Sequence, residues 1–264
     1  MLDLVRVEKT FNPGTINQKQ ALGGISLHLE EGEFVTVIGG NGAGKSTMLN
    51  AIAGVWPIDS GVISIGGVNV TGLPEHRRAA FIGRVFQDPM MGTAPSMEIE
   101  ENLALAYRRG RRRGLRWGVT KPERARYHEA LASLGLGLED RMTTKVGLLS
   151  GGQRQALTLL MAALQKPKLL LLDEHTAALD PATASKVLEL SDRIVAENKL
   201  TTMMITHNMS DAIRHGTRLI MMNGGRIVLD ISGKEKTRLT KADLLQKFAE
   251  AAGVQEETDR MLLS

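Results

Sequence analysis

A glycine-rich loop between an apolar run and a helical run limits most strongly what this chain can fold into. Residues Gly39–Thr47 read Gly-Gly-Asn-Gly-Ala-Gly-Lys-Ser-Thr and contain the pattern Gly-x-x-x-x-Gly-Lys-Ser/Thr. Phe34–Ile38 predicts a buried strand before the loop, and Ser46–Ala53 begins a helix after it, which is the setting of a phosphate-binding loop. A dinucleotide fingerprint is excluded, because this stretch lacks the final glycine of Gly-x-Gly-x-x-Gly.

The residue types of this loop suit the phosphates of a nucleoside triphosphate. Glycines let backbone N–H groups wrap the phosphates, and the helix N-terminus adds positive potential. Lys45 is expected to reach the β- and γ-phosphates, and Ser46 to ligate Mg²⁺. The alternative interpretation is a structural glycine-rich turn. The predicted phosphate contacts are Gly39, Asn41, Gly42, Ala43, Gly44, Lys45, Ser46 and Thr47.

The rest of the chain alternates short apolar runs with helical patterns. This alternation predicts an α/β fold whose sheet is mixed and mainly parallel. Ile25–Glu30 and Val62–Ile65 predict an antiparallel β part near the N-terminus, and Gly224-Gly225 predicts a hairpin turn before Arg226–Asp230. The other expected strands are Leu2–Val7, Phe34–Ile38, Ile82–Phe86, Leu169–Leu172, Thr202–Thr206 and Leu219–Met222.

Residues from about 90 to 150 hold helical patterns without a convincing strand, so a helical insertion interrupts the sheet-forming parts. Lys241–Ala251 predicts an amphipathic helix near the C-terminus. The expected division is a nucleotide-binding core of residues 1–89 and 165–232, a helical subdomain of residues 90–164 and a helical tail of residues 233–264.

Composition narrows the function classes. The chain has 264 residues, no Cys and 3% aromatic residues, so disulfide chemistry is excluded and extended base-stacking platforms are disfavoured. Its apolar runs, such as Leu169–Leu172, are far below the roughly 20 residues that span a bilayer, and Met1–Arg6 lacks the features of a secretory signal. We therefore expect a soluble chain that acts at a membrane only through a partner.

Two carboxylates follow the apolar run Leu169–Leu172. In open α/β sheets ligands bind at the carboxyl ends of strands. Asp173 is therefore placed to hold Mg²⁺ or its waters, and Glu174 to orient or deprotonate an attacking water. A strand that merely runs into a polar loop is the alternative.

Gln87 and His207 each follow another expected strand, Ile82–Phe86 and Thr202–Thr206. If the sheet is parallel, both side chains face the same edge as the phosphates. On residue type alone, each is more often a hydrogen-bonded structural residue than a functional one.

The segment Leu149–Gln155 reads Leu-Ser-Gly-Gly-Gln-Arg-Gln before a helical pattern. Ser150 can cap that helix, and a helix N-terminus with a hydroxyl and two glycines is also an anion site. Together with the phosphate loop, this segment resembles the signature of the ATP-binding-cassette (ABC) ATPases. The resemblance covers residues 2–232 and implies the ABC ATPase form of the phosphate-loop fold, with ATP and Mg²⁺ as cofactors.

The resemblance assigns roles to residues that the pattern alone leaves open. Gln87 matches the glutamine that meets Mg²⁺ and water, and His207 matches the histidine that touches the γ-phosphate. Asp180 matches the aspartate of a loop at the dimer interface, and Phe11 the aromatic residue that stacks on adenine, where tyrosine is usual. The signature residues, which face the ATP held by a second copy of the chain, are Ser150, Gly151, Gly152 and Gln153.

The resemblance implies that this chain is the ATP-hydrolysing subunit of a transporter. Its expected partners are a second copy, transmembrane permease subunits and, indirectly, an extracytoplasmic solute-binding protein. The expected location is peripheral, on the cytoplasmic side of the inner membrane, and wider similarity implies a bacterial importer of small solutes such as amino acids. Met90, Met91 and Met97 after Gln87 suit either an adaptable docking groove or ordinary core.

Other interpretations stay open at this point. The basic cluster Arg108–Arg116 suits a solvated loop, lipid head groups or nucleic acid, although no nucleic-acid partner is expected. A soluble ABC ATPase acting on nucleic acid or ribosomes is the alternative function. A phosphate-loop kinase would require neither the Leu149–Gln155 segment nor Glu174.

Overall fold

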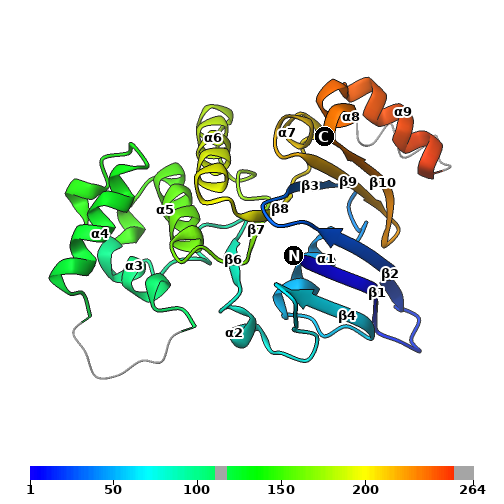
Figure 1. Cartoon of the computed structure of the whole chain (residues 1–264), viewed down its shortest axis with the longest axis horizontal. Helices are drawn as coiled ribbons and strands as arrows, with labels where there is room; N and C mark the ends of the chain where they lie inside the picture. Colours follow the sequence, from blue (N-terminus) through cyan, green and yellow to red (C-terminus); the bar gives the residue numbers. More distant parts are fainter. Residues whose placement is uncertain (111–117, 253–264) are drawn as a thin grey trace.

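The computed structural model describes residues 1–110 and 118–252 and contains two sheets (Figure 1). The smaller sheet is antiparallel and has the strand order β2-β1-β4-β5. It confirms the predicted antiparallel part near the N-terminus. Its strands are β1 (Leu2–Phe11), β2 (Lys19–Leu29), β4 (Ser60–Ile65) and β5 (Val68–Asn69). The strand β5 was not expected from the sequence. Strand β1 continues four residues beyond the expected end at Val7, and β2 begins six residues before the expected start at Ile25.

The larger sheet has the order β10-β9-β3-β8-β7-β6. Its neighbours are parallel except β9 and β10, which form the predicted hairpin across Gly224-Gly225. Both glycines have positive φ, 51° and 74°, which a two-residue hairpin turn requires. The strands are β3 (Phe34–Ile38), β6 (Ile82–Val85), β7 (Leu169–Asp173), β8 (Thr201–Ile205), β9 (Arg218–Asn223) and β10 (Arg226–Ser232).

The register of the parallel strands brings several polar residues to one edge. Val85 of β6 lies opposite Leu172 of β7, and Ile205 of β8 lies opposite both Asp173 and Val37. The residues that directly follow these strands therefore leave the sheet together. This edge is where the phosphate loop begins.

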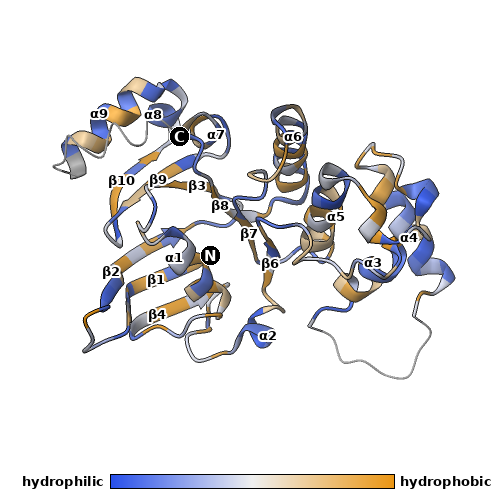
Figure 2. Cartoon of the chain, turned by 180° about the vertical axis from the view of Figure 1, so that it is seen from behind, coloured by the Kyte–Doolittle hydropathy of each residue, from blue (hydrophilic) through white to orange (hydrophobic). Residues whose placement is uncertain are grey.

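Helices cover the sheets unevenly. Helix α1 lies in the apolar core between the two sheets, whereas α3, α4, α5 and α6 share a second core with the other face of the larger sheet (Figure 1). The strands are largely apolar, and α4 is largely polar (Figure 2). Within the described residues no helix is long and apolar enough to cross a bilayer. The helices are α1 (Lys45–Ala53), α2 (Glu75–Arg78), α3 (Ile99–Tyr107), α4 (Lys121–Ala132), α5 (Gly151–Ala163), α6 (Pro181–Asn198), α7 (Met209–Arg214), α8 (Gly233–Arg238) and α9 (Lys241–Ala252).

The C-terminal segment packs on the hairpin of β9 and β10. Leu244 and Phe248 of α9 are fully buried in a core with Ile231 of β10, which explains the predicted amphipathic pattern. The short helix α8 was not predicted, because its six residues carry no apolar stripe. Its Lys236 is buried and donates to the carbonyls of His215 and Gly216, which follow α7.

The basic cluster Arg108–Arg116 lies partly outside the described residues, since Arg111, Arg112, Arg113 and Arg116 fall in residues 111–117. The Arg108 guanidinium forms an ion pair with Glu123 of α4 at 2.8 Å. Arg109 donates to the carbonyl of Ala162 at 3.1 Å. These two arginines therefore take part in packing around α3.

Candidate functional site

The phosphate loop makes two turns that only glycine accommodates. A Cβ atom on Gly39 would lie 2.2 Å from the Met222 carbonyl oxygen, and one on Gly44 would lie 2.5 Å from that of Ala21. Gly44 also has φ of 100° and precedes α1 without a side-chain cap. Because glycine has no side chain to cap the helix, the first N–H groups of α1 stay available to an anion.

Lys45 projects back over this loop. Its side chain is buried, and Nζ donates to the carbonyls of Gly39 at 2.6 Å and Gly40 at 3.2 Å. Burial lowers the pKa of the ammonium group, while the charges of Glu174 and Asp173 oppose that shift. A cation held among backbone dipoles beside two carboxylates is a suitable partner for phosphate oxygens.

A cavity of about 310 Å³ opens above the loop and gathers residues from distant parts of the chain. Phe11 from the end of β1 and Glu174 from the end of β7 both line it. Phe11 packs edge-on against Trp56, with ring centroids 5.6 Å apart. The other lining residues are Lys19, Ala21, Asn41, Gly42, Ala43, Gly44, Lys45, Ser46 and Thr47.

Glu174 has an unusual backbone for a non-glycine residue. Its φ is +44°, and its N–H donates to the carbonyl of Ile205 at 3.0 Å. One carboxylate oxygen lies 3.5 Å from Nδ1 of His207, which follows the neighbouring strand β8. Left-handed backbone at a non-glycine position is strained and is common at functional sites.

Asp173 lies directly before Glu174 and is held by an arginine. Oδ2 of Asp173 lies 3.1 Å from a guanidinium nitrogen of Arg84 on β6. Burial raises the pKa of the Asp173 carboxyl group, and the hydrogen bond and charge of Arg84 oppose that shift. A second cavity, of about 660 Å³, contains Asp173, Arg84, Asn50 and Gln87 in its lining.

The signature residues begin α5 as predicted. Ser150 caps the helix by accepting from the Gln153 N–H, and the Gln153 side chain accepts from the Ser150 N–H in return. A Cβ atom on Gly152 would lie 2.3 Å from a methyl group of Thr183, so this glycine allows α5 to approach α6 closely. Asp180 caps α6 by accepting from the Thr183 N–H at 3.0 Å, which lowers the pKa of its carboxyl group.

The structure therefore brings together one part of the predicted site and leaves another part elsewhere. Phe11, the phosphate loop and Glu174 share one cavity, and His207 contacts Glu174. Among the described residues that line the 310 Å³ and 660 Å³ cavities, neither the signature residues Ser150–Gln153 nor Asp180 occur.

Three further residues at the site were missed in the sequence. Lys19, opposite Phe11 in the β1–β2 pairing, adds a cation to the phosphate cavity. Trp56 supports Phe11, and Arg84 holds Asp173. Only Arg84 carried a signal, as a charged residue inside the apolar run Ile82–Phe86.

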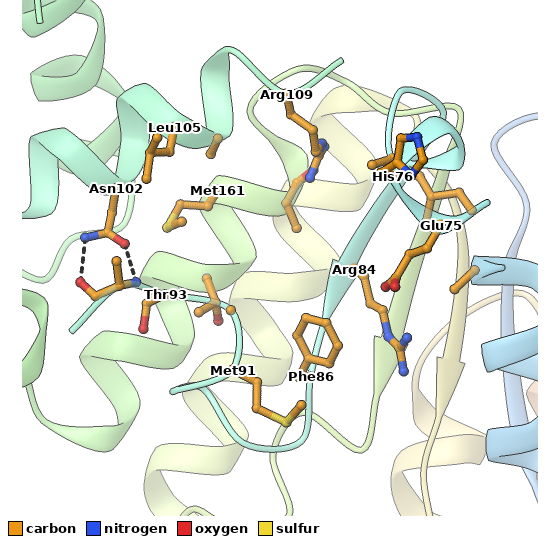
Figure 3. Close-up of a pocket in the computed structure, with 18 of the residues that line it drawn as sticks. Glu75, His76, Arg84, Phe86, Met91, Thr93, Asn102, Leu105, Arg109 and Met161 are labelled. Atoms are coloured by element: carbon orange, nitrogen blue, oxygen red, sulfur yellow. Dashed lines mark hydrogen bonds between the residues drawn. The ribbon is translucent and has the colours of Figure 1, made fainter. Parts of the chain in front are cut away.

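A groove of about 560 Å³ lies beside the second cavity, between β6 and helices α2, α3 and α5 (Figure 3). Met91 lines the groove and is 69% exposed, whereas Met97 is half-buried. Asn102 of α3 fixes the loop after β6 by accepting from the Ala94 N–H and donating to its carbonyl. Arg109 and Arg84 bring positive charge to opposite parts of the lining.

His175 lies directly after Glu174 and is fully enclosed. Its Nε2 lies 2.9 Å from Oγ of Ser191, and that hydroxyl donates its one proton to the Val187 carbonyl. The imidazole must therefore donate through Nε2. Burial lowers the pKa of His175 from 6.5 to about 4.

This burial predicts an acid-sensitive fold. The folded chain holds His175 neutral, whereas the unfolded chain takes up a proton below its pKa of 6.5. Stability should be complete above pH 6.5 and fall by about 3 kcal/mol as the pH drops to about 4. Urea unfolding between pH 7 and pH 5 measures this slope, which should be shallower in His175→Gln; equal slopes in both proteins would contradict the assignment.

Comparisons with known proteins bear on the family. The model of the ABC transporter family matches residues 22–177, more than half of the chain. This chain belongs to the ABC transporter family. The ABC chain is thus an ATP-binding subunit and an ATPase, as the motifs predict.

Two curated relatives align with nearly the whole ABC chain. It is 45% identical to a tyrosine transport ATP-binding protein of Clostridioides difficile, over 94% of this chain and 98% of that protein. It is 30% identical to an aliphatic sulfonates import ATP-binding protein of Pseudomonas putida, over 93% and 86%. Among solved structures, it resembles a dimeric ATP-binding cassette in a post-hydrolysis state with ADP and Pi, with a TM-score of 0.74, 31% identity and coverage of 88% and 98%.

Proposed function

We propose that this chain hydrolyses Mg²⁺–ATP to power the import of a small solute, an amino acid such as tyrosine. The position of Glu174 in the same cavity as the phosphate loop carries the proposal for hydrolysis. The cargo class is supported by the 45% identity to a tyrosine transport ATP-binding protein over almost the full length of both chains.

In the proposed reaction, the loop N–H groups and Lys45 bind the phosphates, and Phe11 stacks on the adenine. Glu174 accepts a proton from the water that attacks the γ-phosphorus, and His207 contacts the γ-phosphate beside it. The 3.5 Å separation between His207 and the Glu174 carboxylate supports a shared role. Asn41, Gly42 and Thr47 complete the wall of the phosphate cavity.

The oxygen donors at the sheet edge fit Mg²⁺. Ser46 offers a hydroxyl, Asp173 a carboxylate and Gln87 an amide oxygen, which are the hard ligands that Mg²⁺ takes together with water and phosphate oxygens. Asp173 is half-buried, with a side-chain exposure of 17%, at the sheet edge where the phosphate loop begins, which supports a role for its carboxylate in holding the metal. The bound ion would neutralise charge on the β- and γ-phosphates.

We also assign the signature to a site shared between two copies. The Ser150 hydroxyl is exposed at the N-terminus of α5, and it lies outside the cavity that its own phosphate loop forms. In a two-fold dimer, Ser150, Gly151, Gly152, Gln153 and Asp180 of one copy would face the nucleotide of the other. The dimeric ADP-and-Pi structure at 31% identity supports this arrangement.

Permease subunits would dock in the groove beside Met91, on the cytoplasmic side of the membrane, with a solute-binding protein delivering cargo on the far side. The groove adjoins the loop that contains Gln87, which supports coupling between docking and the nucleotide site. Residues 1–89 and 165–232 would form the ATP-binding core, residues 90–164 the helical subdomain and residues 233–264 the tail.

Uptake in cells tests this function. A strain without the gene should lose most of its uptake of labelled tyrosine, and the wild-type gene should restore it while Glu174→Gln should not, because the cargo moves only with ATP turnover. Methionine and an aliphatic sulfonate serve as alternative cargoes. Unchanged tyrosine uptake together with lost sulfonate or methionine uptake would overturn the cargo and keep the transport function; normal uptake with Glu174→Gln would overturn the role of hydrolysis.

A further inference from the structure

Arg84 lies between the groove and the nucleotide site. It is in β6 and lines the 560 Å³ groove (Figure 3). It also lines the 660 Å³ cavity that contains Gln87 and Asp173. Its side chain is 13% exposed. A movement of the Arg84 side chain therefore changes the lining of both the groove and the cavity.

The Arg84 guanidinium is held on the nucleotide side. One terminal nitrogen donates to Oδ1 of Asn50 on α1 at 2.8 Å and to Oδ2 of Asp173 at 3.1 Å. The group also lies over the ring of Phe86, 4.6 Å from its centroid. Its Nε is buried and has no hydrogen-bond partner, so the present position does not satisfy all its donors.

This contact has a consequence for the metal. A carboxylate that already pairs with a cation binds a second cation less tightly, because the two compete for the same oxygens and repel each other. Asp173 and Arg84 are both largely buried, with side-chain exposures of 17% and 13%, so water screens this competition only weakly. Arrival of Mg²⁺ at Asp173 should therefore weaken the Arg84 contact.

A second carboxylate is available to the displaced arginine. Glu75 of α2 lines the same two cavities as Arg84, and Figure 3 draws both side chains in the lining of the groove. Glu75 is exposed, and its carboxylate has no hydrogen bond or ion pair among the described contacts. A carboxylate in the same cavity lining is a suitable second counter-ion for the Arg84 guanidinium.

We propose that Arg84 is a positioning residue that holds the Asp173 carboxylate and is displaced toward Glu75 when the metal–nucleotide complex binds. Metal binding would thus change the charge that the groove presents to a docked permease segment. This inference rests on the assignment of Asp173 to Mg²⁺ in the proposed function.

The metal affinity of the ADP complex tests whether Arg84 competes with the metal for Asp173. Mn²⁺, visible by EPR, is titrated as a substitute for Mg²⁺ into the full chain saturated with ADP. Arg84→Met should tighten Mn²⁺ binding about tenfold, because the competing charge is gone. Arg77→Met, which removes an exposed charge from the same region, should leave it unchanged. Unchanged or weaker binding by Arg84→Met would overturn the proposal.

Glu75→Gln tests the displacement of Arg84 toward Glu75, and it leaves the buried arginine in place. It should weaken Mn²⁺ binding several-fold in the wild-type background, since Arg84 loses its alternative partner, and it should have no effect in Arg84→Met. No effect in the wild-type background would overturn the move toward Glu75, even if Arg84→Met failed to fold. Asp173→Asn distinguishes a failure of this inference from a failure of the proposed function. If this variant binds Mn²⁺ like wild type, the assignment of Asp173 to the metal is wrong.

Discussion

Replacement of Glu174 by glutamine is expected to stop ATP turnover and leave ATP binding nearly intact. Glutamine keeps the size of the side chain and its place in the cavity with the phosphate loop, but it cannot accept a proton from water. The loss of a general base lowers kcat by about 10²–10⁴-fold. Phosphate release measures the rate, and calorimetry with ATP measures the affinity.

The same variant should accumulate as a dimer with ATP, because in the proposed shared site the γ-phosphate contacts both copies and is not removed. Size-exclusion chromatography with and without ATP reports this state. Glu189→Gln, a matched change at an exposed position on α6, serves as the control and should behave as wild type. A Glu174→Gln protein that turns over ATP near the wild-type rate would refute the assignment of the base.

Mixing two inactive variants should restore activity. Lys45→Ala removes the cation at the phosphates, and Ser150→Arg places a bulky charged side chain at the exposed N-terminus of α5. In the proposed shared arrangement, each variant alone has a defect in both composite sites of its dimer. In a mixed dimer one site carries both defects and the other carries none.

The recovered rate follows from random pairing. Half of the dimers are mixed and each has one intact site, so an equal mixture should reach about a quarter of the wild-type rate if the two sites act independently. The ATPase rate is measured before and after the two proteins are combined. Each variant measured alone at twice the concentration is the control. A mixture no faster than the mean of the two variants, or full activity of either variant alone, would contradict the shared site.

Local chemistry made the core of the site predictable. The glycines of the phosphate loop, Lys45 and the acidic pair after Leu169–Leu172 were all found in the sequence because each motif is contiguous. The strand register then puts their ends at one edge, as the parallel arrangement predicts. The Ser150 cap was predictable for the same reason, since a capping box spans only four residues.

Residues brought in by long-range pairing could not be predicted. Lys19 reaches the phosphate cavity because β2 pairs with β1 through several register shifts, and no local pattern fixes such shifts. The edge-on contact between Phe11 and Trp56 joins two separate segments. Arg84 was visible as a charge in an apolar strand, but its partners Asn50 and Asp173 depend on the packing of α1 and β7 around it.

The close approach of α5 to α6 has a bearing on how mutational data for this chain should be interpreted. At Gly152 any side chain meets the Thr183 methyl group, so an inactive substitution there reports interhelical distortion and a damaged partner contact at once. Ser150 is different, because among the described residues its exposed hydroxyl bonds only within its own turn. A mutational scan that seeks the contribution of the neighbouring copy should therefore give weight to position 150 and discount position 152.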